Sequence, residues 1–201
     1  LSKAFNPEHP FLFILGGAKF STKIPLVRKF LPSADSIFIG GALANDFLKA
    51  KGHEVGVSTV SSSPVDLSDI INNPKIFSGV DVAVANEGNK DLAHIETDDN
   101  IADIGFKPAE LLKTKIAEAK FILWNGPFGI YEKGFTWGTE ECARLIASNE
   151  SAIKIVGGGD TLAAIAKLGV EDKFTFTSSG GGAMLDFLAQ GTLPGIEALK
   201  K

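Results

Sequence analysis

The stretch IKIVGGGDT, residues 153–161, joins a short apolar run to a glycine-rich turn. Such β-branched runs are typical of strands that are buried on both faces of a parallel sheet. Glycine allows a sharp turn at the carboxyl end of the strand and lets a ligand come close to the backbone. A helix that begins after the turn offers unpaired N–H groups and a partial positive charge. The stretch therefore predicts a strand, a turn and a helix N-terminus suited to phosphate.

The same pattern occurs at four other places, where an apolar run stops at a glycine-rich turn: residues 11–19, 36–41, 121–127 and 174–182. Periodicity predicts helices between the strands, at residues 22–31, 42–50, 108–119, 139–147, 161–168 and 183–189. Alternating strands and helices with short connections indicate a parallel sheet covered on both faces. We therefore expect a Rossmann-like, three-layer α/β/α sandwich with a mostly parallel sheet of about six strands.

The less regular segments give weaker predictions. Residues 80–85 read as a further buried strand, residues 66–72 as a short helical stretch, and residues 87–103 as an acidic, solvated loop. Pro25 is expected in the first turn of its helix, where a missing N–H is tolerated.

Composition narrows the class of protein. A chain of 201 residues can form one domain with a substantial core. Its net charge of −4 argues against a nucleic-acid partner, and no apolar stretch approaches the roughly 20 residues that span a bilayer. A single cysteine, Cys142, excludes an internal disulfide and fits a reducing compartment. We therefore expect a cytoplasmic protein with no nucleic-acid and no membrane partner.

The usual nucleotide signatures are missing, since neither G-x-x-x-x-G-K-[ST] nor G-x-G-x-x-G occurs. Instead, Lys19 follows a glycine pair and Lys23 comes four residues later, near a predicted helix start. A cation there opposes the helix dipole by roughly 0.3–1 kcal/mol, which an anion bound beside it would offset. The other interpretation is two solvated lysines on a polar helix face.

Three further residues suggest nucleotide chemistry. Asp160 and Thr161 are good N-caps, so a capping pair without a ligand is one interpretation. In the other, the N–H groups of Gly158 and Gly159 hold a phosphate and Asp160 binds Mg²⁺ on it. Glu132 follows another of the turns and is either a ribose ligand or an exposed glutamate.

Taken in order, these segments resemble the phosphoglycerate kinase family, in its C-terminal, nucleotide-binding half. The matching segments are residues 15–19 with Lys23, 39–45, 124–132, 157–161, 179–183 and 193–195. Each motif alone is modest, but the ordered set is specific and covers nearly the whole chain except residues 55–80.

The resemblance implies a glycolytic kinase that reversibly transfers a phosphoryl group from 1,3-bisphosphoglycerate to Mg-ADP, giving 3-phosphoglycerate and ATP. It implies that Lys19, Gly158, Gly159 and Gly181 act on the phosphoryl group and that Asp160 holds Mg²⁺. The nucleotide-binding positions that it implies are Gly17, Ala18, Lys23, Gly41, Asn125, Pro127, Ile130, Glu132, Gly158, Gly159, Asp160 and Thr161. Such transfer needs in-line positioning and positive charge rather than a protein nucleophile, and the residues fit that need.

Members of this family also have an N-terminal half that binds 3-phosphoglycerate and supplies an arginine, and this chain shows no counterpart of it. We therefore expect a connector at residues 1–10, a nucleotide-binding domain at 11–190, and a tail at 191–201 that packs on the other half. Such a piece would be a monomer that binds ADP or ATP without turnover and meets 1,3-bisphosphoglycerate or 3-phosphoglycerate through the other half.

The alternative is a non-catalytic nucleotide-binding or interaction module of the same fold. Retained Lys19, Lys23, Asp160 and Glu132 favour the enzyme over this alternative. Ala42 replaces a glycine that is usual in the family, and contacts to adenine from residues 55–80 and 101–105 stay open.

Overall fold

The computed structural model describes residues 1–63 and 65–199, and a six-stranded, fully parallel sheet forms its centre. The strand order is β3-β2-β1-β7-β8-β9. The strands are β1 (Phe11–Leu15), β2 (Ser36–Ile39), β3 (Ile76–Phe77), β7 (Phe121–Asn125), β8 (Ile153–Gly157) and β9 (Phe176–Ser178). The chain winds outward from β1 to β3 and then returns to β7 on the other side of β1. The β1–β7 boundary is therefore the topological switch point, where open α/β sheets place their ligands.

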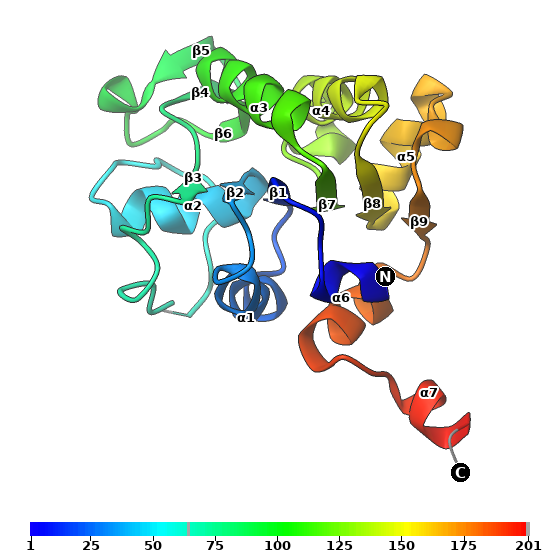
Figure 1. The fold of residues 1–201 in the computed structure, drawn as a ribbon. Helices are drawn as coiled ribbons and strands as arrows, with labels where there is room; N and C mark the ends of the chain where they lie inside the picture. Colours follow the sequence, from blue (N-terminus) through cyan, green and yellow to red (C-terminus); the bar gives the residue numbers. More distant parts are fainter. Residues whose placement is uncertain (64, 200–201) are drawn as a thin grey trace.

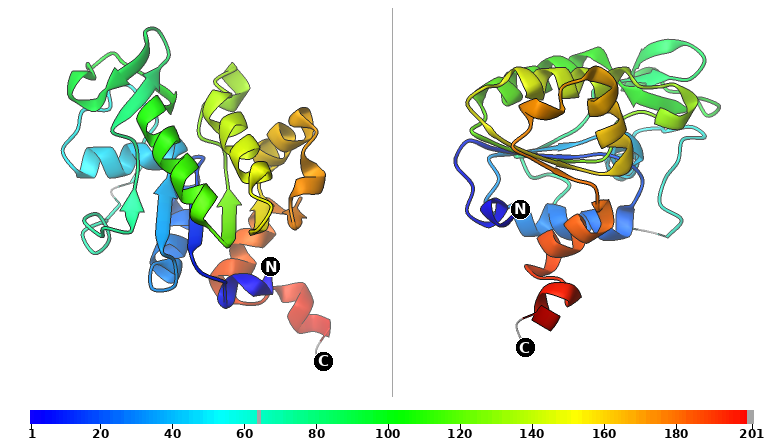
Figure 2. Two further views of the ribbon diagram at one scale, coloured as in Figure 1. Left: turned by 45° about the horizontal axis from the view of Figure 1, so that its top comes forward. Right: turned by 90° about the vertical axis from the view of Figure 1, so that its right-hand side faces the viewer.

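Helices cover both faces of the sheet (Figure 1; Figure 2, right). One face carries α1 (Phe20–Phe30), α2 (Gly41–Ala50) and α6 (Gly181–Gln190), and the other α3 (Phe106–Glu118), α4 (Trp137–Ser148) and α5 (Gly159–Leu168). The expected three-layer α/β/α sandwich is thus confirmed. The last described helix, α7 (Pro194–Leu199), extends away from the sheet beyond α6 (Figure 1). Residues 200 and 201 of the expected tail lie outside the described residues.

Short 3₁₀ helices complete the chain at Ser2–Phe5, Leu92–His94, Tyr131–Lys133 and Glu171–Lys173. Within the described ranges, every helix is too short or too polar to traverse a lipid bilayer.

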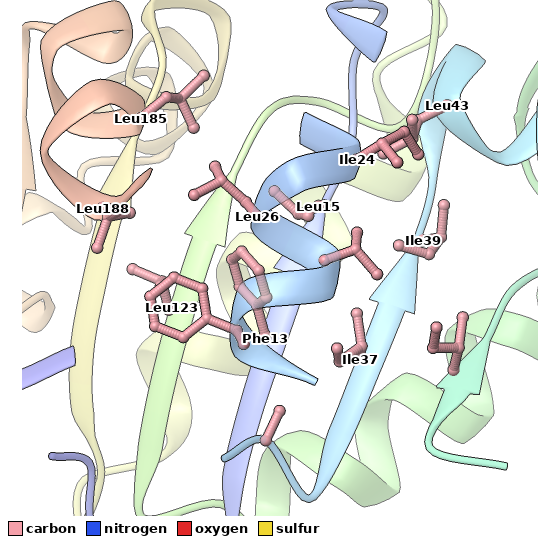
Figure 3. Packing of buried hydrophobic residues seen from close by; sticks show 14 of the residues in the cluster. Phe13, Leu15, Ile24, Leu26, Ile37, Ile39, Leu43, Leu123, Leu185 and Leu188 are labelled. Carbon is pink, nitrogen blue, oxygen red and sulfur yellow. The ribbon is translucent and has the colours of Figure 1, made fainter. Parts of the chain in front are cut away.

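Alternate residues of each central strand belong to two separate apolar cores. Phe13 and Leu15 of β1 pack with Ile24 and Leu26 of α1 (Figure 3), whereas Ile14 packs in the core beneath α3 and α4. Because both faces of the sheet are covered, every residue of β1 is buried, which explains the continuous apolar run in the sequence.

A second, antiparallel sheet confirms one expectation and corrects another. It has the order β5-β4-β6, with β4 (Asp81–Val84), β5 (Gly88–Asp91) and β6 (Ile101–Ile104), and contacts α2 and α3. The segment read as a further buried strand is indeed a strand and lies at the centre of this small sheet, whereas the segment read as a loop holds β5 and most of β6. Val82 and Val84 are apolar because they pack with Leu48 of α2 in a third small core.

The six predicted helices each begin one or two residues earlier than expected. Helix α1 begins at Phe20, so Pro25 lies in its second turn rather than its first. The helix expected at residues 66–72 does not form: residues 68–72 form turns, and the side chain of Asp66 accepts the N–H of Ser68.

Candidate active site

The glycine-rich turns leave the sheet from one row of residues. The strand register aligns Ile39, Leu15, Asn125, Gly157 and Ser178 across β2, β1, β7, β8 and β9. Helices α1, α2, α5 and α6 begin just beyond this row, so four helix N-termini share the same edge. The glycine-rich turns therefore meet at one edge of the sheet.

The turns at the switch point pack backbone against backbone. The N–H of Gly17 donates to the carbonyl of Pro127 at 2.7 Å, and the N–H of Gly16 donates to that of Asn125 at 2.9 Å. A Cβ on Gly16 would lie 2.2 Å from the Pro127 oxygen. Gly41 has a φ of +62°, and a Cβ there would lie 2.4 Å from the Gly17 nitrogen. These glycines are needed because the backbones of three loops touch.

The turn after β8 joins the same cluster. Gly158, with a φ of 108°, is the N-cap of α5, and a Cβ on Gly181 would lie 3.1 Å from its Cα. The hydroxyl of buried Thr161 accepts the N–H of Gly126 at 3.2 Å, which ties α5 to the turn after β7. A Cβ on Gly159 would meet no atom within 4 Å, so the first turn of α5 is open.

A pocket of about 740 Å³ lies along this edge, within the size range of small-molecule sites. Most of the residues singled out from the sequence line it: Gly17, Ala18, Lys19, Lys23, Gly41, Asn125, Pro127, Ile130, Glu132, Gly158, Gly159, Asp160 and Gly181. Thr161 is the exception, because it is fully buried behind the turn.

The two lysines have different environments. Lys23 is only 3% exposed, and its Nζ donates to the carbonyl of Gly16. Burial and, secondarily, the charge of Lys19 lower the pKa of Lys23 to about 8, while Asp160 acts in the opposite direction. Lys19 is exposed and is the N-cap residue of α1. The interpretation of two solvated lysines is therefore wrong for Lys23.

Asp160 lies in the first turn of α5 and is exposed. Gly158, not Asp160 or Thr161, is the N-cap, and no side chain caps this helix. The interpretation as a side-chain capping pair is therefore wrong. Among the described residues, none forms an ion pair or hydrogen bond with the Asp160 carboxylate, which lines the pocket together with Lys23.

Another acidic group lies away from this edge. Within residues 1–63 and 65–199, three carboxylates close enough to share a metal ion belong to Glu87, Glu96 and Asp99. The ammonium group of Lys90 already lies among them, with Nζ–oxygen distances of 2.9, 3.3 and 3.0 Å. This cluster is therefore an ion-pair network.

The pocket also reaches residues that the sequence analysis did not single out, several of them in the segments 55–80 and 101–105, where contacts to adenine were left open. Its far end is lined by Asn45 and Leu48 of α2, Val57, Val82 of β4 and all four residues of β6. These side chains come together only because the antiparallel sheet packs against α2 and α3. Apart from Asn45, which lies in the matching segment 39–45, they belong to no motif, so the sequence alone could not identify the individual residues.

One of these residues, Asp103 of β6, is a buried carboxylate. It is 5% exposed and accepts the N–H groups of Ile104 at 2.8 Å and Gly138 at 3.0 Å. Burial raises the pKa of Asp103 to about 6, although the two N–H donors act in the opposite direction.

Known proteins with the same ordered segments give an independent comparison. A family model described as phosphoglycerate kinase matches residues 1–191. The phosphoglycerate kinase of Dictyoglomus turgidum is 44% identical, over 97% of this chain and 53% of the relative. That of Fusobacterium nucleatum is 43% identical, over 96% of this chain and 52% of the relative.

Solved structures agree with these matches. Phosphoglycerate kinase from Coxiella burnetii aligns with a TM-score of 0.90 and 36% identity, over 99% of this chain and 55% of that chain. The enzyme from Pyrococcus horikoshii OT3 aligns with a TM-score of 0.82 and 32% identity, over 98% of this chain and 54% of that chain. The chain spans about half the length of the curated relatives that it matches.

Replacing Lys23 with methionine tests the buried charge. The pKa of Lys23 is lowered to about 8 in the folded chain, so unfolding takes up a proton between pH 8 and the model-peptide value of 10.5. Below pH 8 the lysine is charged in both states, and its burial destabilises the fold. As the pH rises through this window, the unfolding free energy of the wild type should rise by about 3 kcal/mol relative to Lys23→Met.

Chemical denaturation of both proteins between about pH 7 and pH 11 measures this difference. Lys113→Met, at an exposed lysine of α3, is the matched control and should show no such dependence. A constant difference between wild type and Lys23→Met would contradict a charged, desolvated Lys23.

Proposed function

We propose, since this chain belongs to the phosphoglycerate kinase family, that its pocket binds ADP or ATP with Mg²⁺ as the nucleotide-binding half of such a kinase. One observation carries the proposal: the buried ammonium of Lys23 and the open N-terminus of α5 line the same pocket. A polyphosphate between them would meet a fixed cation, a helix dipole and free N–H groups. That combination is selective for a multiply charged anion over a neutral ligand.

The residues also suit Mg²⁺. This ion prefers one or two carboxylates together with phosphate oxygens and waters. Asp160 provides one exposed carboxylate beside the phosphate-binding end, and no described residue forms an ion pair or hydrogen bond with that carboxylate. When bound, Mg²⁺ would reduce the negative charge that the phosphates carry.

The other end of the pocket suits a nucleoside. Gly41, Pro127 and Ile130 supply backbone and apolar surface, and exposed Glu132 offers a carboxylate to ribose hydroxyls. Beyond them, Leu48 and residues of β6 extend the apolar wall, in keeping with a planar base.

Phosphoryl transfer between ADP and an acyl phosphate requires positioning and charge compensation. In the forward direction, a terminal oxygen of ADP forms a bond to phosphorus while the bond from phosphorus to the carboxylate oxygen breaks. Exposed Lys19, the N–H groups of Gly158 and Gly159 and the α6 terminus at Gly181 surround the edge where the moving group would lie. They would stabilise its equatorial oxygens.

The acyl substrate is proposed to bind outside this chain. We assign 1,3-bisphosphoglycerate and 3-phosphoglycerate to the part of the relatives that this chain does not match. The surface of α7, where Leu199 is 88% exposed and Ile196 38%, suits packing of the tail on that part. We propose in addition that this half-enzyme is monomeric and cytoplasmic.

Calorimetric titration of ADP with and without Mg²⁺ tests nucleotide binding. We expect binding at or below about 1 mM ADP, tighter with Mg²⁺, and a smaller Mg²⁺ effect in Asp160→Asn because the metal loses its carboxylate. Asp172→Asn, in an exposed 3₁₀ turn outside the pocket, is the control. Absence of ADP binding would favour the non-catalytic module.

The phosphate contact of Lys23 makes a second prediction. Lys23→Met should weaken ADP by about 10- to 100-fold, since a hydrogen bond from a charged donor contributes about 1.5–3 kcal/mol. Lys113→Met should leave the affinity unchanged. Equal affinity of wild type and Lys23→Met in the same titration would remove Lys23 from the site.

Catalysis by the isolated chain is the third test. We expect no ATP from 1,3-bisphosphoglycerate and Mg-ADP in a coupled assay that records ATP release, because the acyl substrate has no binding surface in the proposed half. Turnover above the uncatalysed background would refute this assignment of the acyl-phosphate site.

A further inference from the structure

The loop between β7 and α4, residues 126–136, carries three of the proposed nucleotide contacts, Pro127, Ile130 and Glu132. The last two lie in its outer part, residues 129–136 (the outer loop). Two adjacent residues of strand β6, Ala102 and Asp103, accept hydrogen bonds from this loop and from a residue just beyond it. The carbonyl of Ala102 accepts the N–H of Ile130 at 2.8 Å. The carboxylate of Asp103 accepts the N–H of Gly138, just beyond the loop, at 3.0 Å.

The carboxylate of Asp103 packs against the Cα atoms of Gly129 and Gly138, where any larger residue would place a side chain. A Cβ on Gly129 would lie 2.0 Å from the carbonyl oxygen of Phe135 and 2.8 Å from the Asp103 Cγ, and a Cβ on Gly138 would lie 2.4 Å from the Asp103 Oδ1. Neither glycine has a positive φ, so space rather than backbone conformation excludes a side chain at these two positions.

The carboxylate of Asp103 also caps the N-terminus of α4. The N-cap residue of that helix, Thr136, makes no side-chain capping hydrogen bond. Gly138 lies in the first turn, and its N–H is satisfied by the carboxylate from β6 instead. A carboxylate at this position interacts favourably with the helix dipole. With a pKa of about 6, Asp103 is mostly ionised at neutral pH.

The phosphate-binding end has separate supports. The N–H of Gly126 is held by Thr161, and the turn after β1 is held by Lys23 and by the carbonyl of Pro127. These contacts do not involve β6. Loss of the Asp103 contact would therefore release the outer loop while the phosphate-binding turns stay in place.

We infer that Asp103 is a positioning residue, which holds the outer loop so that Ile130 and Glu132 line the nucleoside end of the pocket. The inference rests on the proposed nucleotide function. It assigns Asp103 an effect on the affinity for the nucleoside part of the ligand and little effect on the affinity for its phosphates.

Comparison of Mg-ADP with Mg-pyrophosphate separates the two ends. In Asp103→Ala we expect ADP to bind about tenfold more weakly and pyrophosphate within twofold of wild type, both by calorimetry. Asp103→Asn keeps the shape and one acceptor oxygen, so its loss of ADP affinity should be smaller. Equal weakening of both ligands, or an unchanged ADP affinity, would overturn the inference.

Asn149→Ala is the matched control for loss of a buried polar group. Asn149 is 9% exposed, donates to the carbonyls of Ile116 and Ala119, and accepts the N–H groups of Ser151 and Ala152, all away from the pocket. This variant should have a lower Tm and an unchanged ratio of ADP to pyrophosphate affinity. The same result for the Asp103 variants would reduce Asp103 to a structural role.

Hydrogen exchange on the wild type tests the inference without a variant, should the Asp103 variants not fold. Mg-ADP is expected to protect the amides of Ile130 and Gly138 more than Mg-pyrophosphate does. Equal protection by both ligands would contradict the inference. If the wild type binds neither ligand, the proposed function fails and this inference fails with it; if it binds both and the ratio is insensitive to Asp103, only the inference fails.

Discussion

The contact between the backbones of three loops at the switch point determines the rest of the structure. The Gly17 N–H meets the Pro127 carbonyl, and Gly41 packs against both, at distances that no side chain would permit. Because these loops cannot separate without losing buried backbone hydrogen bonds, the ends of β1, β2 and β7 stay in one fixed arrangement. The pocket, its lysine and its open helix terminus all take their positions from this contact.

Lys23 shows how the fold maintains an energetically unfavourable charge. Its ammonium group is almost completely desolvated and is hydrogen-bonded to a carbonyl. Desolvation of a charge disfavours the ionised form, which is the main cause of the lowered pKa. The apolar layers on both sides of the sheet compensate for this burial. An anion that enters the pocket would restore the favourable interactions that the lysine lost when it left water.

The sequence predicted the structure best at the pocket, where a particular backbone geometry is required. The glycine-rich turns predicted the parallel sheet and most of the pocket lining, because glycine is required there whatever the surrounding residues are. It was least informative for the antiparallel sheet, since short strands such as Asp81–Val84 resemble buried parallel strands until their partners are known. Asp103 was missed for a similar reason. A single aspartate has no periodicity, and its importance arises from Gly129 and Gly138, which are distant from it in sequence.

The two tryptophans occupy contrasting positions around the pocket. Trp124 is fully buried, and its indole N–H donates to the carbonyl of Gly126 at the floor. Trp137, at the start of α4, is 40% exposed and packs edge-on against Phe106 with ring centroids 5.1 Å apart. Their indoles therefore differ in polarity of surroundings, and their emission should differ in wavelength. The chain thus contains intrinsic fluorophores at the inner and outer ends of the same loop, which allow each end to be followed optically without a label.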